Sequence, residues 1–154
     1  KCVIVYPVAK FTLRLNFGTV NGYSTETSYK TPCWTTFHGL FDRSYGFSGA
    51  ESFALPESVA RSKDKLDLST PLNFVTDHDI SGGNSGSPML NKKGEVVGLV
   101  FDVNTYSLPN RYIAVDPHDR ARAVSLHSRA ILEALGKVYQ MHGLVAEISG
   151  RAAP

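Results

Sequence analysis

The segment 82–88, GGNSGSP, constrains the fold of this chain more than any other. Glycine inside a helix or strand costs about 0.5–1 kcal/mol relative to alanine, so glycines gathered around Ser85 indicate a loop with unusual backbone angles or a close approach. An apolar hairpin follows directly. We expect strands at Met89-Leu90 and at Glu95 to Phe101, joined by a turn at Asn91 to Gly94.

The residues of this loop allow two interpretations. In the first, Ser85 is an acyl-transfer nucleophile, which must be exposed and must lie beside N–H donors that stabilise an oxyanion. The backbone N–H groups of Gly83 and Ser85 could form that oxyanion hole, and Gly86 leaves room beside the hydroxyl. In the second, Ser85 only caps a backbone group in a glycine-rich turn. We favour the nucleophile, because the whole string precedes a hydrophobic hairpin.

The rest of the chain indicates strands followed by a helix. Residues 11–17 alternate strictly between apolar and polar types, which predicts a half-buried strand. Asn21-Gly22 is a candidate tight turn between Val20 and Tyr23. Further expected elements are weaker strands at 34–40 and 72–75, a short helix at 56–65, and a longer helix beginning at 128. The order predicts a mainly β fold, a barrel or a sandwich, that ends in a packed helix.

Composition narrows the classes of function. A chain of 154 residues fits one domain with its own core, and a net charge of +2 argues against a nucleic-acid or membrane partner. No run reaches the roughly 18–20 apolar residues of a membrane span. The start has neither an initiator Met nor the layout of a signal peptide, so we expect a fragment of a longer protein. Cys2 and Cys33 either form one disulfide or stay reduced, and we favour the reduced form.

Segment 82–88 resembles the nucleophile loop of chymotrypsin-fold serine peptidases, notably glutamyl endopeptidases and bacterial dipeptidyl peptidases of the 7 and 11 type. Nearly the whole chain resembles the C-terminal catalytic region of the second group, in the same order, over residues 6–23, 65–75, 82–104 and 128–139. The resemblance implies the C-terminal half of a double β-barrel. Residues 1–154 would be a single domain of a larger peptidase, with the barrel at about 6–116 and a terminal helix at about 128–142.

A serine nucleophile needs a histidine that accepts its proton and a carboxylate that orients this histidine. His78 lies seven residues before Ser85, but a base on the same short loop would require the loop to fold back sharply. The remaining histidines show no spacing typical of a triad or a metal site: His38, His118, His127 and His142. The resemblance places the base and its Asp in the N-terminal barrel. We therefore expect the isolated chain to be inactive, with no metal site and no cofactor.

The resemblance also places the walls of the primary specificity pocket. The candidate substrate-binding residues are Gly82, Asp102, Val103 and Asn104. At the position of Val103 the resembled enzymes commonly carry glycine when they accept hydrophobic side chains, and arginine when they prefer Asp or Glu. An aliphatic Val103 disfavours acidic substrates and predicts small or medium apolar ones, unless it is only a strand residue. Asp79 and Asp102 either face the substrate amine or form internal hydrogen bonds, and we favour the internal role.

The resemblance implies a serine-type dipeptidyl aminopeptidase that releases dipeptides from free N-termini through an acyl-enzyme on Ser85. It further implies peptide substrates, a homodimer, and a periplasmic or secreted location. His78 and His127 depart from the family pattern, which has a small and an acidic residue there. Two alternatives remain open: an endopeptidase of the glutamyl type, and a non-catalytic pseudo-peptidase or peptide-binding domain. The endopeptidase should lack the stretches at 12–23 and 66–75, and both are present.

Overall fold

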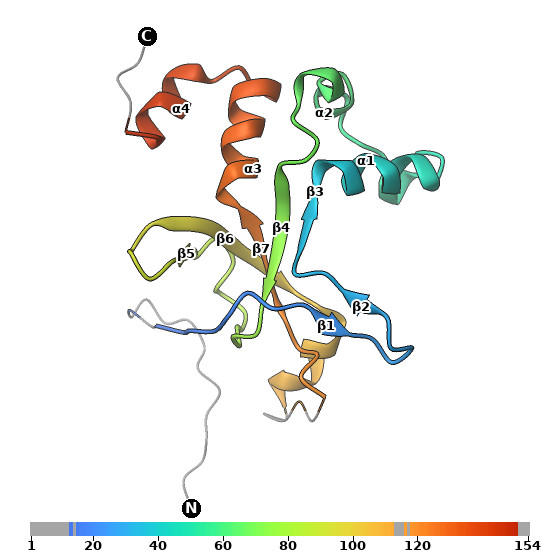
Figure 1. The fold of residues 1–154 in the computed structure, drawn as a ribbon, viewed down its shortest axis with the longest axis vertical. Helices are drawn as coiled ribbons and strands as arrows, with labels where there is room; N and C mark the ends of the chain where they lie inside the picture. Colours follow the sequence, from blue (N-terminus) through green and yellow to red (C-terminus); the bar gives the residue numbers. More distant parts are fainter. Residues whose placement is uncertain (1–12, 14, 113–115, 117, 151–154) are drawn as a thin grey trace, which may run out of the picture. The chain divides into compact units, whose positions relative to one another are not determined.

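The computed structural model describes residues 13, 15–112, 116 and 118–150 (Figure 1). These residues fall into two compact units. The first unit extends to Trp34 and continues over Phe74–Leu126, whereas the second contains Thr35–Asn73 and continues from His127. In the described part of the chain, no helix is long and apolar enough to cross a membrane.

The strands of the described residues form a two-stranded sheet and a five-stranded sheet. In the small sheet, β1 and β2 are antiparallel, with Tyr23 opposite Thr31. In the large sheet the strand order is β3-β4-β7-β6-β5. The strand bounds are β1 Tyr23–Ser24, β2 Lys30–Thr31, β3 Trp34–Thr36, β4 Pro71–Thr76, β5 Pro88–Leu90, β6 Val96–Val103 and β7 Ala123–His127.

The predicted hairpin after segment 82–88 is confirmed. Strands β5 and β6 are antiparallel, with Pro88 opposite Leu99. The chain reverses at Asn91 to Gly94, where the N–H of Gly94 donates to the carbonyl oxygen of Asn91 at 3.0 Å. Gly94 has a φ of 79°, which glycine adopts at little cost. The hairpin fixes the loop around Ser85 at the start of β5.

The core of the first unit lies around Phe74 and Val100, which are both buried. A Cβ atom at Gly98 would lie 2.4 Å from the carbonyl oxygen of Leu126 and 2.6 Å from a ring carbon of Phe74. Only glycine therefore allows β6 and the Phe74 ring to approach this closely. The unit also contains the 3-10 helix η3, Thr105–Arg111, directly after β6.

The second unit is built from helices around an apolar core. Its buried apolar residues are Phe37, Phe41, Leu66, Ala130 and Ala146. Phe37 and Phe41 are four residues apart, so one face of the first helix is buried. The bounds are α1 Phe37–Gly46, the 3-10 helix η1 Glu51–Phe53, α2 Glu57–Ala60, the 3-10 helix η2 Lys63–Lys65, α3 Ser128–Glu133, the π-helical segment η4 Ala134–Val138 and α4 His142–Ile148.

The predicted strand at 11–17 is wrong over its described residues. Residues 13 and 15–17 are not in a strand, and Leu13, Leu15 and Phe17 are each about 90% exposed. Strict alternation identifies a surface that a sheet partner would bury, but it does not supply that partner. The first backbone pairing along the described chain is the isolated bridge between Val20 and Thr76.

The hairpin turn predicted at Asn21-Gly22 is also wrong. The chain reverses later, where the N–H of Thr25 donates to the carbonyl oxygen of Tyr29 at 2.9 Å and Ser28 adopts a φ of 63°. A two-residue Asn-Gly turn needs positive φ angles, and neither residue 21 nor residue 22 has one. Gly22 instead lies so close to the carbonyl oxygen of Thr31 that a Cβ would be 2.3 Å from it.

Other predicted elements keep their place but change their bounds. The strand at 72–75 is β4, whereas the strand predicted at 34–40 ends at Thr36 and continues as α1. The helix predicted at 56–65 is divided into α2 and η2. The helix predicted at 128–142 consists of α3 and η4, followed by α4 after an interruption. Gln140 has a φ of 54°, and this left-handed conformation ends the helical run.

Candidate active site

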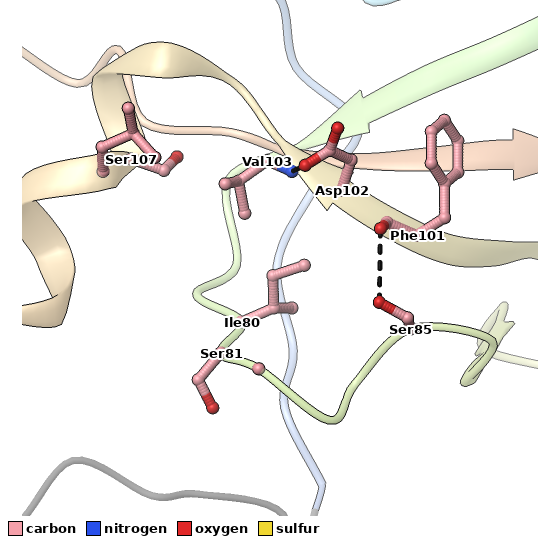
Figure 2. A pocket seen from close by; sticks show the side chains of 9 residues that line it. Ile80, Ser81, Ser85, Phe101, Asp102, Val103 and Ser107 are labelled. Atoms are coloured by element: carbon pink, nitrogen blue, oxygen red, sulfur yellow. Dashed lines mark hydrogen bonds between the residues drawn. The ribbon is translucent and has the colours of Figure 1, made fainter.

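Ser85 is exposed and lies beside strand β6 (Figure 2). Its hydroxyl donates a hydrogen bond to the carbonyl oxygen of Phe101 at 3.3 Å. The next residue anchors the loop, because the N–H of Gly86 donates to the carbonyl oxygen of Val100 at 2.7 Å. The N–H of Val100 in turn donates to Ser87 at 3.0 Å. The side chain is therefore held on a loop whose exit is fixed to a core strand.

The backbone around Ser85 requires glycine at two positions. Gly83 has a φ of 97° and Gly86 a φ of 86°, which side-chain-bearing residues rarely adopt. Between them, the N–H of Asn84 donates to the carbonyl oxygen of Ser81 at 3.2 Å, and the Asn84 amide oxygen accepts from the N–H of Ser81 at 3.0 Å. The loop is thus a defined turn, closed at its start by Asn84.

Two N–H groups of this turn have no acceptor in the part of the chain that the structure describes. Those of Asn84 and Gly86 are paired, but none of the described residues accepts a hydrogen bond from the N–H of Gly83 or of Ser85. These are the two donors that the sequence predicts for an oxyanion hole. An oxyanion hole requires two such donors that face one oxygen beside the nucleophile.

A cavity of about 100 Å³ opens beside Ser85 in the first unit (Figure 2). The structure brings Gly82, Asp102 and Val103, three of the predicted substrate-binding residues, to this cavity together with Ser85. Asn104 is not among the lining residues. The others are Ile80, Ser81, Phe101, Ser107 and Leu108.

Sequence reasoning missed Ser107 and Leu108, which reach the cavity from helix η3. A single 3-10 helix has no apolar period that could have identified them, and only their place just after the predicted pocket strand pointed to this region. Figure 2 shows Ser107 and Ser85 on opposite sides of Val103 and Ile80. The cavity therefore has an apolar centre, with the candidate nucleophile at one side.

Asp102 is the single charged side chain among the described residues that line the cavity. It is exposed, and its carboxylate accepts a hydrogen bond from the N–H of Val103 at 2.8 Å. The backbone carbonyl oxygen of Asp79 accepts a hydrogen bond from the side-chain amide of Asn16. The described lining thus contains one carboxylate and no cationic side chain.

The structure places His78 away from a catalytic arrangement with Ser85. Its ring is buried, and Nδ1 is 2.7 Å from the hydroxyl of Thr76. Burial lowers the pKa of His78, and the negative charges of Asp77 and Asp79 only partly oppose this. The His78 ring is thus bonded within the protein, to Thr76.

Of the remaining histidines, one caps a helix and three are exposed. His127 caps α3, where its Nδ1 accepts from the N–H of Arg129 at 3.1 Å; burial, followed by the Arg129 cation, lowers the pKa of this histidine. His38, His118 and His142 are exposed. Cys33 is half-buried, and Cys2 lies outside the described residues. Over the described ranges, no group of three or more His, Cys, Asp or Glu residues could hold a metal ion.

Comparisons with known proteins agree with one another. Dipeptidyl-peptidase 7 of Porphyromonas endodontalis is 35% identical over 147 residues, which is 92% of this chain and 18% of that protein. The Asp/Glu-specific dipeptidyl-peptidase of Shewanella putrefaciens is 33% identical over 175 residues, with coverage of 94% and 23%. The crystal structure of Porphyromonas endodontalis DPP11 in complex with dipeptide Arg-Glu has a TM-score of 0.78 at 23% identity, covering 92% of this chain and 21% of that one.

The chain thus spans only 18% and 23% of the length of the two curated relatives. The likeness to the solved structure shows a shared fold. The model of the Peptidase S46 family matches residues 3–150, almost the whole sequence. The family resemblance expected from the sequence is therefore confirmed, and the chain belongs to the Peptidase S46 family.

Proposed function

We propose that this chain supplies the nucleophile of a serine-type dipeptidyl aminopeptidase, and that the nucleophile is Ser85. One observation carries the proposal: an exposed hydroxyl lies at the edge of a cavity, in a turn where the N–H groups of Gly83 and of Ser85 itself have no acceptor among the described residues. The names of the relatives, dipeptidyl-peptidase 7 and Asp/Glu-specific dipeptidyl-peptidase, support the reaction class.

In this mechanism the Ser85 hydroxyl oxygen attacks the carbonyl carbon of the second peptide bond of the substrate. The carbonyl oxygen becomes an oxyanion, and the N–H groups of Gly83 and Ser85 donate to it. One such donor contributes about a hundredfold to a thousandfold to turnover in serine peptidases. The serine proton passes through a base to the leaving amine, and water then hydrolyses the ester and releases the dipeptide.

The base and its orienting carboxylate come, in this proposal, from another part of the full-length protein. No described histidine hydrogen-bonds Ser85, and the nearby His78 is bonded to Thr76 instead. Residues 1–154 are then one domain of a larger peptidase, the C-terminal half of a chymotrypsin-like double barrel. The homodimer and the periplasmic or secreted location also belong to this proposal, and they rest on the family resemblance.

The cavity favours a small or medium apolar side chain on the acyl side of the scissile bond. Its volume of about 100 Å³ is below the ~150 Å³ of an apolar protein cavity that holds benzene. Val103 and Ile80 supply apolar surface, and no described lining residue supplies a cation for an acidic substrate. Gly82 and Asp102 contact the substrate from the same cavity in this proposal.

A matched pair of peptides tests the reaction class in the full-length protein. The two peptides have one sequence with a small apolar second residue, and one of them has an acetylated N-terminus. We expect a dipeptide from the free peptide only. Equal cleavage of both would favour an endopeptidase of the glutamyl type, and binding without cleavage of either would favour a pseudo-peptidase.

A further inference from the structure

Asn104 follows β6 directly, but its side chain turns into a hydrogen-bond network and is not part of the cavity lining. Its amide nitrogen donates to the carbonyl oxygen of Arg120 at 2.7 Å. Its amide oxygen accepts from the hydroxyl of Ser107 at 2.9 Å and from the N–H of Arg122 at 3.0 Å. One side chain thereby joins helix η3 to the segment that enters β7.

Ser107, the buried end of this network, does line the cavity. Its hydroxyl donates to the amide oxygen of Asn104 at 2.9 Å, with the carbonyl oxygen of Arg122 farther away at 3.3 Å, and its oxygen accepts from the N–H of Arg122 at 2.9 Å. The proton and one of the two lone pairs of this hydroxyl are thus engaged within the protein. Asn104 supplies the nearest acceptor for the hydroxyl of this lining residue.

A buried arginine fixes the far side of the network. The side chain of Arg122 is 1% exposed, and its guanidinium donates to the carbonyl oxygens of Asn21 at 3.0 Å and Gly22 at 2.8 Å. The backbone of the same residue holds Asn104, because the N–H of Asn104 donates to its carbonyl oxygen at 2.9 Å. Asn104 thus connects the cavity wall to a residue whose side chain is buried and bonded to the Asn21-Gly22 backbone.

We propose that Asn104 is a positioning residue, which acts through Ser107 to fix the cavity wall and so determines which side chains the cavity accepts. The inference rests on the proposed peptidase function. Without the Asn104 amide, the Ser107 hydroxyl loses its nearest acceptor and keeps only its bonds to the backbone of Arg122, so the wall at Ser107 and Leu108 is held less tightly. The bond between Ser85 and Phe101 does not involve Asn104. Discrimination between substrates should then fall, while the nucleophile keeps its reactivity.

The test uses Asn104→Ala in the full-length protein. Asn91→Ala is the matched control, because its amide oxygen likewise accepts two hydrogen bonds, from the N–H groups of Lys93 at 2.9 Å and Glu95 at 3.1 Å, in the turn between β5 and β6. Both variants are assayed on two dipeptidyl substrates with free N-termini, one with alanine and one with phenylalanine in the second position.

We expect Asn104→Ala to reduce the ratio of kcat/KM between the two substrates about tenfold, mainly through KM, since a pocket wall contacts ground state and transition state alike. A serine-directed phosphonate with only a methyl group on the acyl side should label the variant within about twofold of the wild-type rate. Asn91→Ala should change neither quantity. Ser107→Ala removes only the anchoring hydroxyl, so we expect a smaller shift of the kcat/KM ratio in the same direction. If Asn104→Ala does not fold, Ser107→Ala serves as the test.

If Asn104→Ala lowered kcat/KM equally for both substrates, or slowed phosphonate labelling by as much as it lowered kcat/KM, Asn104 would only stabilise the fold. An unchanged ratio in both variants would equally overturn the positioning role. Each of these outcomes leaves the proposed function in place, because the wild-type protein still releases dipeptides. A wild-type protein that cleaves neither substrate overturns the proposed function, and this inference with it.

Discussion

The hydroxyl of Ser85 donates its hydrogen bond to the carbonyl oxygen of Phe101, 3.3 Å away. Phe101 directly precedes Asp102 and Val103, so the candidate nucleophile is tied to the same stretch of β6 that lines the cavity. A base that activates the serine must replace this carbonyl as the acceptor of the proton. The hydrogen bond thus keeps the hydroxyl in place without making it a nucleophile on its own.

Val103 is predicted to control the size of the accepted side chain. In Val103→Gly the lost isopropyl group leaves room for larger apolar residues, and apolar pockets discriminate by about 1–3 kcal/mol per such group. We expect relative kcat/KM to shift about tenfold to a hundredfold from small towards aromatic second residues. Val103→Arg should instead improve Asp and Glu, because a guanidinium pairs a carboxylate at two points.

Both Val103 variants are assayed in the full-length protein on one series of dipeptidyl substrates. The series needs small, aromatic and acidic side chains in the second position, all with free N-termini. Unchanged ratios across the whole series would remove Val103 from the specificity site.

His78 should make stability depend on pH. Burial holds its pKa below the ordinary value of 6.5, so the unfolded chain binds a proton more readily than the folded one. This contribution to the free energy of unfolding is complete above pH 6.5 and is lost as the pH falls from there towards the folded-state pKa. His78→Gln can still hydrogen-bond Thr76 but does not titrate. Denaturant unfolding between about pH 5 and 7 should give a flatter pH profile than the wild type.

His38→Gln provides the control, since it makes the same replacement at a histidine that is exposed. The control should follow the wild-type profile. If His78→Gln retains the full wild-type slope, the buried imidazole is not the source of the pH dependence.

Arg122 is expected to be a major stabilising residue of the first unit. Arg122→Ala leaves the carbonyl oxygens of Asn21, Gly22 and Ala121 without this donor. A hydrogen bond to a charged group contributes about 1.5–3 kcal/mol, and this guanidinium is 1% exposed, so the free energy of unfolding should fall by at least about 3 kcal/mol. Arg61→Ala is the contrast, since its pair with Glu57 is exposed on both sides and should contribute less than about 0.5 kcal/mol. If urea unfolding showed that Arg122→Ala and Arg61→Ala lower the free energy of unfolding by similar amounts, this account would be contradicted.

The sequence was sufficient where local chemistry decides the structure. Glycines and a proline around Ser85 predicted the loop, the apolar runs after it predicted β5 and β6, and Asn91 to Gly94 predicted the turn. Three of the four predicted substrate-binding positions line one cavity with Ser85. In each case the deciding residues lie within about one hairpin of one another, so their interactions can be deduced from spacing.

The sequence was insufficient where segments that are far apart along the chain determine the structure. Arg122 donates hydrogen bonds to carbonyl oxygens about a hundred positions earlier in the chain, and no periodicity in the sequence predicts such a contact. For the same reason the Asn21-Gly22 pair, which is typical of a tight turn, serves here as an acceptor of that arginine. The backbone partners of the Asn104 side chain at 120 and 122 come into reach only in the folded unit, so these bonds could not be predicted from the sequence.

The most direct test of the central claim is the turnover of Ser85→Ala in the full-length protein. Loss of a triad serine leaves only the residual catalysis of substrate binding and the oxyanion hole. The account predicts that kcat for dipeptide release falls by at least about a thousandfold, that phosphonate labelling disappears, and that the unfolding midpoint is unchanged. Normal dipeptide release by a correctly folded Ser85→Ala variant would contradict the assignment of Ser85 as the nucleophile.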